Sequence, residues 1–139
     1  MLFIPPAARK GTVRQALIHI DRDTHFFVEN ASRMERLQER CQVLPLASDQ
    51  LLRPVVPRHY LVRRGKLRVS QFLDDGREIV RAVLQAGSRL STLPATTDQD
   101  SPPVAIGDKP AADLYSLASI VIMALGETEL WAFSRDPRP

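Results

Sequence analysis

The chain has 139 residues, enough for one domain with a buried core, and its hydrophobic fraction of 44% and charged fraction of 25% are those of an ordinary globular protein. Its apolar runs are far shorter than the roughly 20 residues of a membrane-spanning helix, and residues 1–6 are too short for a secretory signal. With Cys41 as the single cysteine, no intrachain disulfide can form. We therefore expect a cytoplasmic protein without a membrane partner.

The first predicted elements are an undecided segment and one helix. Residues 15–20 fit either a short strand or the start of a helix. From Phe27 onward apolar residues recur every three or four positions, which predicts a helix over residues 32–40. Ser32 and Glu35 have the spacing of a capping box at its start, and its apolar stripe is expected to pack on the rest of the domain.

The middle of the chain has the pattern of β-structure. Three prolines in and after residues 43–56 predict short edge strands and turns. Leu67 and Val69 alternate with polar residues, as in a strand with one wet face, and residues 74–76 (Asp-Asp-Gly) are typical of a hairpin turn. The apolar run 79–84 predicts a buried return strand.

The last third begins with a long loop. Residues 88–112 are polar and rich in proline, which predicts a long flexible loop. Residues 114–125 are apolar and contain several β-branched side chains, which favours a strand, and residues 128–133 predict a closing strand.

Four pieces of the chain, in this order, resemble the cyclic-nucleotide-binding-like domain of the Crp/Fnr regulators. Residues 60–69 are similar to its strand–glycine–strand element, and residues 75–78 (Asp-Gly-Arg-Glu) to its hairpin turn. Residues 84–87 are similar to the entry into its phosphate-binding cassette, and residues 124–132 to its last hairpin. Each piece alone is weak, but their order and spacing together point to this fold.

The resemblance implies a mainly β fold, a double-stranded β-helix (jelly roll) preceded by an N-terminal helix. It divides the chain into an N-terminal extension and helix over residues 1–41 and a β-roll over residues 42–136. The predicted loop, residues 88–112, lies within the β-roll.

The resemblance also implies where a ligand would bind, and the sequence departs from the family there. Ligand-binding members place Gly-Glu, a short helix and an arginine around the cyclic phosphate, using amide donors and a charge-assisted pair. Here Gly87 is followed by Ser88 and Arg89, and the place of the arginine falls at Ala118, beside Ser119. We expect no cyclic-nucleotide binding. Gly87, Ser88, Arg89 and Ser119 are the candidates for a pocket with a different ligand.

Two further features are candidates for contact with a partner. Arg63, Arg64, Lys66 and Arg68 form the one locally dense basic run, which is either a solvated strand face or a patch for an anionic partner. Trp131 either seals the end of the barrel or, if exposed, anchors a protein partner.

Catalysis is not indicated. The histidines, His19, His25 and His59, form no His-x-His pair of the kind that a metal-dependent β-roll enzyme needs, and His59 is expected at the surface near a strand end. There is no nucleophile motif, phosphate loop or dinucleotide fingerprint. The iron–sulfur members of the family need several thiolates, which Cys41 alone cannot supply. We expect no enzyme activity, metal or cofactor.

Three functional hypotheses follow. The first is a non-catalytic regulatory or adaptor module that acts through protein–protein contacts, as a homodimer if the family habit holds. The second is a small-molecule sensor with residues 88–112 as a lid over its ligand. The third is transcriptional control through association with polymerase or another regulator. The sequence contains no recognition helix of the family's helix-turn-helix type, so direct sequence-specific DNA binding is not expected.

Overall fold

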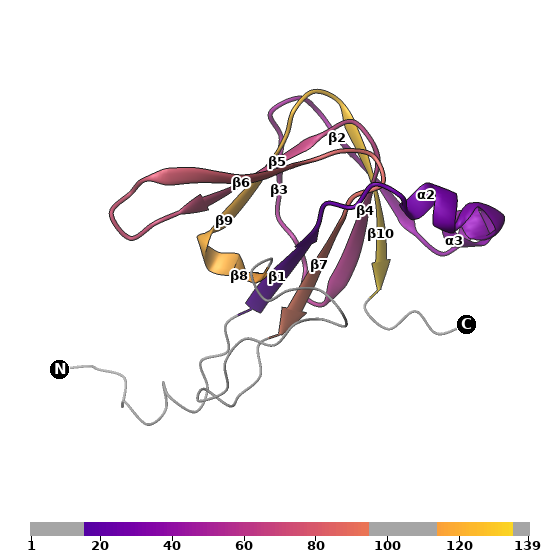
Figure 1. The fold of residues 1–139 in the computed structure, drawn as a ribbon, viewed down its shortest axis with the longest axis horizontal. Helices are drawn as coiled ribbons and strands as arrows, with labels where there is room; N and C mark the ends of the chain where they lie inside the picture. Colours follow the sequence, from indigo (N-terminus) through magenta and orange to yellow (C-terminus); the bar gives the residue numbers. More distant parts are fainter. Residues whose placement is uncertain (1–15, 95–113, 135–139) are drawn as a thin grey trace.

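The computed structural model of the chain describes residues 16–94 and 114–134, which form two antiparallel sheets and a short helical segment (Figure 1). One sheet has six strands in the order β2-β10-β4-β7-β1-β8, and the other has four in the order β3-β9-β5-β6. In chain order the elements are β1 (Ala16–Asp21), α2 (Phe26–Glu29), the 3-10 helix η1 (Ala31–Arg33), α3 (Met34–Glu39), β2 (Gln42–Leu46), β3 (Leu51–Leu52), β4 (Arg58–Arg64), β5 (Leu67–Phe72), β6 (Glu78–Leu84), β7 (Arg89–Pro94), β8 (Leu114–Ser116), the 3-10 helix η3 (Leu117–Ser119), β9 (Ile120–Ala124) and β10 (Thr128–Ser134).

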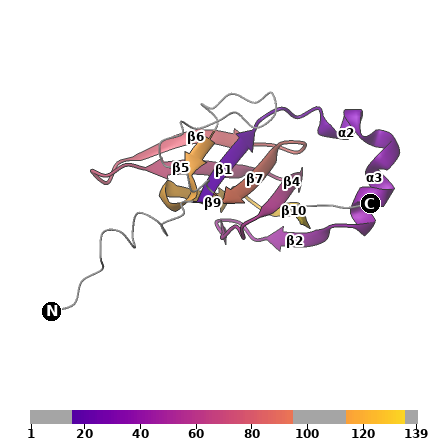
Figure 2. The ribbon, with the colours of Figure 1, turned by 90° about the horizontal axis from the view of Figure 1, so that it is seen from below.

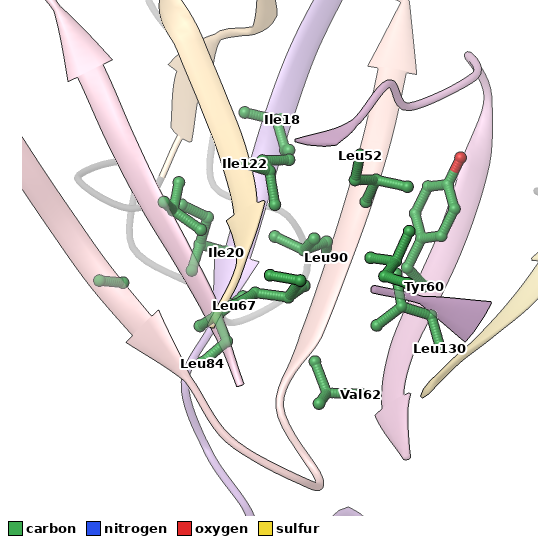
Figure 3. Packing of buried hydrophobic residues seen from close by; sticks show 14 of the residues in the cluster. Ile18, Ile20, Leu52, Tyr60, Val62, Leu67, Leu84, Leu90, Ile122 and Leu130 are labelled. Carbon is green, nitrogen blue, oxygen red and sulfur yellow. The ribbon is translucent and has the colours of Figure 1, made fainter. Parts of the chain in front are cut away.

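The core lies between the inner faces of the two sheets. Ile18, Leu90 and Tyr60 come from the six-stranded sheet, while Leu67 and Ile122 come from the four-stranded sheet, and all five belong to one buried cluster (Figure 3). Along each strand these inward residues alternate with outward ones, as the pleat of a sheet requires. The predicted mainly β roll is therefore confirmed.

The β5–β6 hairpin forms where the sequence predicts it. Leu73 donates its amide to the carbonyl of Arg77 at 2.8 Å, and Gly76 takes a φ of 90°, the left-handed conformation that favours glycine at this position. The predicted closing strand is also present as β10, which lies between β2 and β4.

The N-terminal third differs from the expectation in two ways. The undecided segment forms strand β1, which pairs with β7 and β8, so residues before 42 contribute a strand to the six-stranded sheet. The predicted helix over residues 32–40 is present as the end of η1 followed by α3, and a separate short helix, α2, precedes both. The predicted capping box is wrong, because Ser32 lies inside η1 and the residue before α3, Arg33, makes no side-chain cap.

Strand β6 is not buried as predicted. It forms the edge of the four-stranded sheet. Its outward residues meet solvent because the outer face of that sheet is open, although the run is almost wholly apolar. Val80 is 52% exposed and Val83 is 43% exposed, whereas Leu84 between the sheets is fully buried.

Two predictions for the last third also change. Residues 89–94 of the expected loop form strand β7, paired on both sides with β1 and β4, and the remainder of that loop lies outside the described residues. The single strand predicted over residues 114–125 is interrupted by η3. This break lets the chain pass from the six-stranded sheet at β8 to the four-stranded sheet at β9.

Candidate functional site

The glycine turn at Gly87 is where the family resemblance places a phosphate-binding cassette, and here it is held by the chain itself. Gly87 has a φ of 98°, and a Cβ at this position would lie 2.5 Å from the carbonyl oxygen of Thr24. Its amide donates to the carbonyl of Val62 at 2.8 Å. The backbone carbonyl of Ser88 accepts the amide of Val62 at 2.9 Å. The buried Ser88 hydroxyl donates to the carbonyl of Arg22 at 3.3 Å. The turn therefore fits against β4 and the segment after β1.

Arg89 is engaged within the chain. It lies opposite Asp21 in the β1–β7 register, and its Nη2 donates to Asp21 Oδ2 at 2.6 Å. Its guanidinium also lies over the ring of Phe26, 5.0 Å from the centroid. The Asp21 side chain is 11% exposed, so the pair is shielded from water on its acidic side. A phosphate bound to Arg89 would therefore lie beside this carboxylate and be repelled by its charge.

Two aspartates lead β1 into α2 and so place Phe26 over Arg89. Asp21 Oδ1 accepts the amide of Asp23 at 3.0 Å, and Asp23 Oδ1 accepts the amide of His25 at 2.9 Å. The backbone hydrogen bond from His25, and then its ring nitrogen at 2.7 Å, hold the pKa of Asp23 below its ordinary value. The carboxylate form is thus the one that orders this turn.

Ser119 does not join Ser88 and Arg89 through any described hydrogen bond. Its hydroxyl donates to the carbonyl of Ser116 at 2.9 Å and accepts Gln71 Nε2 at 3.2 Å, so it closes η3 against β5. Ala118, at the aligned place of the family's arginine, is exposed. The four predicted pocket residues therefore divide between the Gly87 turn and the η3 turn.

The basic run of the sequence does not form one patch. Arg63 and Arg64 end β4 in the six-stranded sheet, whereas Arg68 belongs to β5 in the other sheet. Arg64 pairs with Glu129 at 3.2 Å, and Arg68 lies 3.9 Å from Glu78. Lys66 is exposed at the turn between the two strands. These arginines face different carboxylates on different sheets.

Trp131 is 4% exposed, so it is buried and is not the exposed anchor that one reading of the sequence predicted. Its ring contacts the guanidinium of Arg63, 5.4 Å from the centroid, and the same guanidinium lies 5.1 Å from the ring centroid of Phe27. Its indole nitrogen donates to Glu129 at 3.1 Å. Figures 1 and 2 show the helices beyond β4 and β10, at the opposite end of the molecule from the β5–β6 hairpin.

His59 is the second residue of β4, near the strand end as expected, but it is half-buried rather than fully at the surface. Its Nδ1 lies 2.7 Å from the hydroxyl of Ser91 on β7, the residue opposite it in the register.

Burial raises the pKa of the Cys41 thiol, which favours its protonated form. Within residues 16–94 and 114–134, no group of three or more histidine, cysteine or acidic side chains could hold a metal ion, and no helix there is long and apolar enough to cross a membrane.

Sequence reasoning missed the outer face of the four-stranded sheet. Its exposed apolar side chains come from four strands that are far apart in the sequence, and they are Leu51, Phe72, Val80, Val83 and Val121. The available signal was the apolar run of β6, which Arg81 interrupts and which was interpreted as buried. The outward half of its side chains is instead exposed, because the outer face of the sheet is open.

Comparison with solved structures supports the fold. The N-terminal domain of a transcriptional regulator from Streptomyces coelicolor A3(2) aligns with a TM-score of 0.54 at 19% identity, over 84% of this chain and 73% of that one. Thermus thermophilus catabolite activator protein aligns with a TM-score of 0.51 at 18% identity. The match covers 76% of this chain and 43% of the Thermus protein. The heme domain of CooA from Carboxydothermus hydrogenoformans gives 0.50 at 16% identity, over 83% and 70% of the two chains.

No protein-family model and no curated protein matches the sequence. The structural likeness therefore rests on the arrangement of strands, at identities below 20% for these three proteins. The chain has the cyclic-nucleotide-binding-like β-roll fold found in Crp/Fnr-type regulators.

Proposed function

We propose that this chain is a non-catalytic regulatory or adaptor module that acts through protein–protein contacts, with transcriptional control as its context. The fold supports a regulatory role, because two of the similar structures are a domain of a transcriptional regulator and a catabolite activator protein. Fold alone does not specify activity, so the proposal depends on the site.

The Asp21–Arg89 pair is the observation that carries the proposal. A cyclic phosphate needs a cation and amide donors that are available to it. At the Gly87 turn the chain enters strand β7 directly, and the first residue of that strand already pairs with Asp21 at 2.6 Å and stacks on Phe26. Exchanging Asp21 for a phosphate would separate Arg89 from a carboxylate that is only 11% exposed, which is costly.

A thermal-shift titration against cyclic AMP, cyclic GMP and cyclic dinucleotides tests the ligand part of the proposal. We expect a flat response. A ligand at a hundred times its Kd would add about 2.7 kcal/mol of stability and raise the melting temperature by several degrees. A saturable shift that disappears in Arg89→Gln would contradict the proposal, and a cyclic-AMP-binding regulator serves as positive control.

The regulatory part is tested in the source organism by comparing transcripts of a strain that lacks this chain with those of the complemented strain. We expect a defined set of transcripts to change and to return on complementation. Unchanged transcripts under growth conditions in which the chain is expressed would contradict transcriptional control. Fluorescence anisotropy with random and promoter DNA is expected to show no sequence preference.

Two related predictions stand beside this proposal. The homodimer that the resemblance implies is tested by sedimentation velocity over a range of concentrations. The alternative of a small-molecule sensor needs a ligand beneath residues 88–112. The part of that segment in β7 is paired with β1 and β4, so residues 89–94 do not form a lid.

A further inference from the structure

The helical segment, residues 26–39, has no core of its own. No residue of α2, η1 or α3 is buried, and the half-buried apolar side chains are Phe26, Phe27, Met34 and Leu37. The longest helix, α3, has six residues, and a helix shorter than about 12 residues is only marginally stable alone in water. The segment is therefore ordered by its contacts with the rest of the chain.

Two arginines of the six-stranded sheet hold the start of this segment. The guanidinium of Arg89 on β7 lies 5.0 Å from the ring centroid of Phe26, and that of Arg63 on β4 lies 5.1 Å from the ring centroid of Phe27. Within residues 16–94 and 114–134, no hydrogen bond or ion pair joins the helical segment to a strand. A cation–ring contact is weak where water reaches it, and both rings are only half-buried.

The surface between these two points of attachment is apolar and closed to water. Leu61 is 1% exposed and lies in the register between Arg89 and Trp131, which is 4% exposed and rests against Arg63. By contrast, the outer face of the four-stranded sheet, which we call the open face, has large apolar side chains in water, and they are Leu51, Phe72, Val80, Val83 and Val121. Departure of the helical segment would give the six-stranded sheet an apolar surface of the same kind.

The chain is fixed on both sides of the helical segment. Before it, the carbonyl oxygen of Thr24 lies so close to Gly87 that a Cβ there would be 2.5 Å away, and the carbonyl of Arg22 accepts the Ser88 hydroxyl at 3.3 Å. After it, β2 begins at Gln42 and pairs with β10. Figure 2 shows the segment leaving the sheet after β1 and returning at β2. The segment can therefore depart without separating any strands.

We propose that the helical segment is a releasable cover, which opens between its two fixed ends while both sheets stay paired and so uncovers Leu61 and Trp131. Opening breaks the two arginine–ring contacts. A part of a protein with few buried contacts opens at a lower free energy than its core, and elements that move in regulation belong to such parts. The inference goes beyond the proposed function and does not depend on it, because the opening is a property of the free chain.

Amide hydrogen exchange of the full chain, followed by NMR, tests the opening. We expect the helical amides, such as that of Asn30, which donates to Phe26 at 2.9 Å, to exchange at least about tenfold faster than the amides of β10. Val69→Ala, in the core between the sheets, should accelerate exchange in β10 by about tenfold and leave the helical amides unchanged. The reason is that opening of the segment leaves Val69 buried. Equal acceleration of both groups would overturn the proposal, because the segment would then open only on global unfolding.

Acrylamide quenching tests what the opening uncovers, since Trp131 is the single tryptophan of the chain. Phe26→Ala/Phe27→Ala weakens only the closed state, so we expect the quenching constant to rise roughly twofold or more. Phe72→Ala, which removes an exposed ring on the open face, is the matched control and should not change it.

Circular dichroism checks that the sheets persist in each variant. Phe26→Ala replaces the double variant if that does not fold, and Ile122→Val replaces Val69→Ala. Faster exchange of the helical amides with quenching of Trp131 unchanged would overturn the proposal, because the segment would then not be its cover. Neither measurement involves nucleotides or transcripts, so this proposal and the proposed function can fail separately.

Discussion

The outer faces of the two sheets differ in how far their apolar side chains are covered. On the six-stranded sheet, the outer face near β4 and β10 is covered, with Leu61 1% exposed and Trp131 4% exposed beside the helical segment. We call this the covered face. On the open face of the four-stranded sheet, side chains of similar apolar character, such as Val80 at 52%, are exposed.

The arginines on the two faces show what a cover does. On the covered face Arg63 lies between the rings of Phe27 and Trp131, and Arg89 has both Asp21 and the ring of Phe26. On the open face Arg68 has only Glu78 beside it, at 3.9 Å, and no ring contact is described for it. The helices supply aromatic rings to the covered face, and no described element supplies an equivalent to the open face. The two faces therefore differ in their cover: helices pack on one, and apolar side chains stay exposed on the other.

The largest expected difference comes from placing a charge on each face. Leu61→Lys buries an ammonium group beneath the helical segment and is expected to lower the free energy of unfolding by more than about 4 kcal/mol, or to prevent folding. Val121→Lys places the same group at the open face and should change it by less than about 0.5 kcal/mol. Urea denaturation of both variants measures this contrast. Equal losses would mean that the two faces are equally buried.

Trp131→Ala is expected to have the next largest effect. It removes a side chain that is 4% exposed together with its contact to Arg63, at a cost of about 3–5 kcal/mol in unfolding free energy. The matched control, Val83→Ala on the open face, should cost less than about 1 kcal/mol, because Val83 is 43% exposed. Thermal and urea denaturation check both values, and a loss below 1 kcal/mol for Trp131→Ala would argue against the cover.

A double-mutant cycle on Asp21 and Arg89 measures the pair that closes the Gly87 turn. We expect Asp21→Asn and Arg89→Met each to cost about 2 kcal/mol, with a coupling energy of at least about 1 kcal/mol, because Asp21 is shielded from water. The cycle on Arg64 and Glu129 is the control. Arg64 is 72% exposed, so its coupling should stay below about 0.5 kcal/mol. Similar coupling energies in the two cycles would mean that the Asp21–Arg89 pair is too weak to keep a phosphate away from Arg89.

The sequence was sufficient to predict the β-roll fold, but not to predict which faces of its strands are exposed. Gly76 and the alternation of Leu67 and Val69 are local signals, and they predicted the β5–β6 hairpin correctly. Whether the outer face of β6 is covered depends on how the elements pack in three dimensions, which local pattern does not contain. The apolar run of β6 was therefore assigned to the core although Val80 and Val83 are exposed.

The candidate site shows the same limit. Gly87 was singled out correctly as a tight turn, but the engagement of Arg89 was not foreseen. Asp21 meets Arg89 through antiparallel pairing between β1 and β7, which are 68 residues apart along the chain. The basic run from Arg63 to Arg68 is continuous in the sequence and yet divides between two sheets, because the turn at Gly65 redirects the chain.

The smallest expected effect concerns two serines, one on each outer face. Ser91→Ala on the six-stranded sheet removes the hydroxyl that lies 2.7 Å from His59, and should lower the free energy of unfolding by about 1 kcal/mol. Ser70→Ala on the open face removes a buried hydroxyl without a partner, so the unfolding free energy should stay the same or rise by up to about 1 kcal/mol. Urea denaturation at one pH measures both. If Ser70→Ala instead destabilised the chain as Ser91→Ala does, the hydroxyl of Ser70 would have a partner within the chain. Opposite signs would mean that burying this hydroxyl without a partner costs the folded protein free energy.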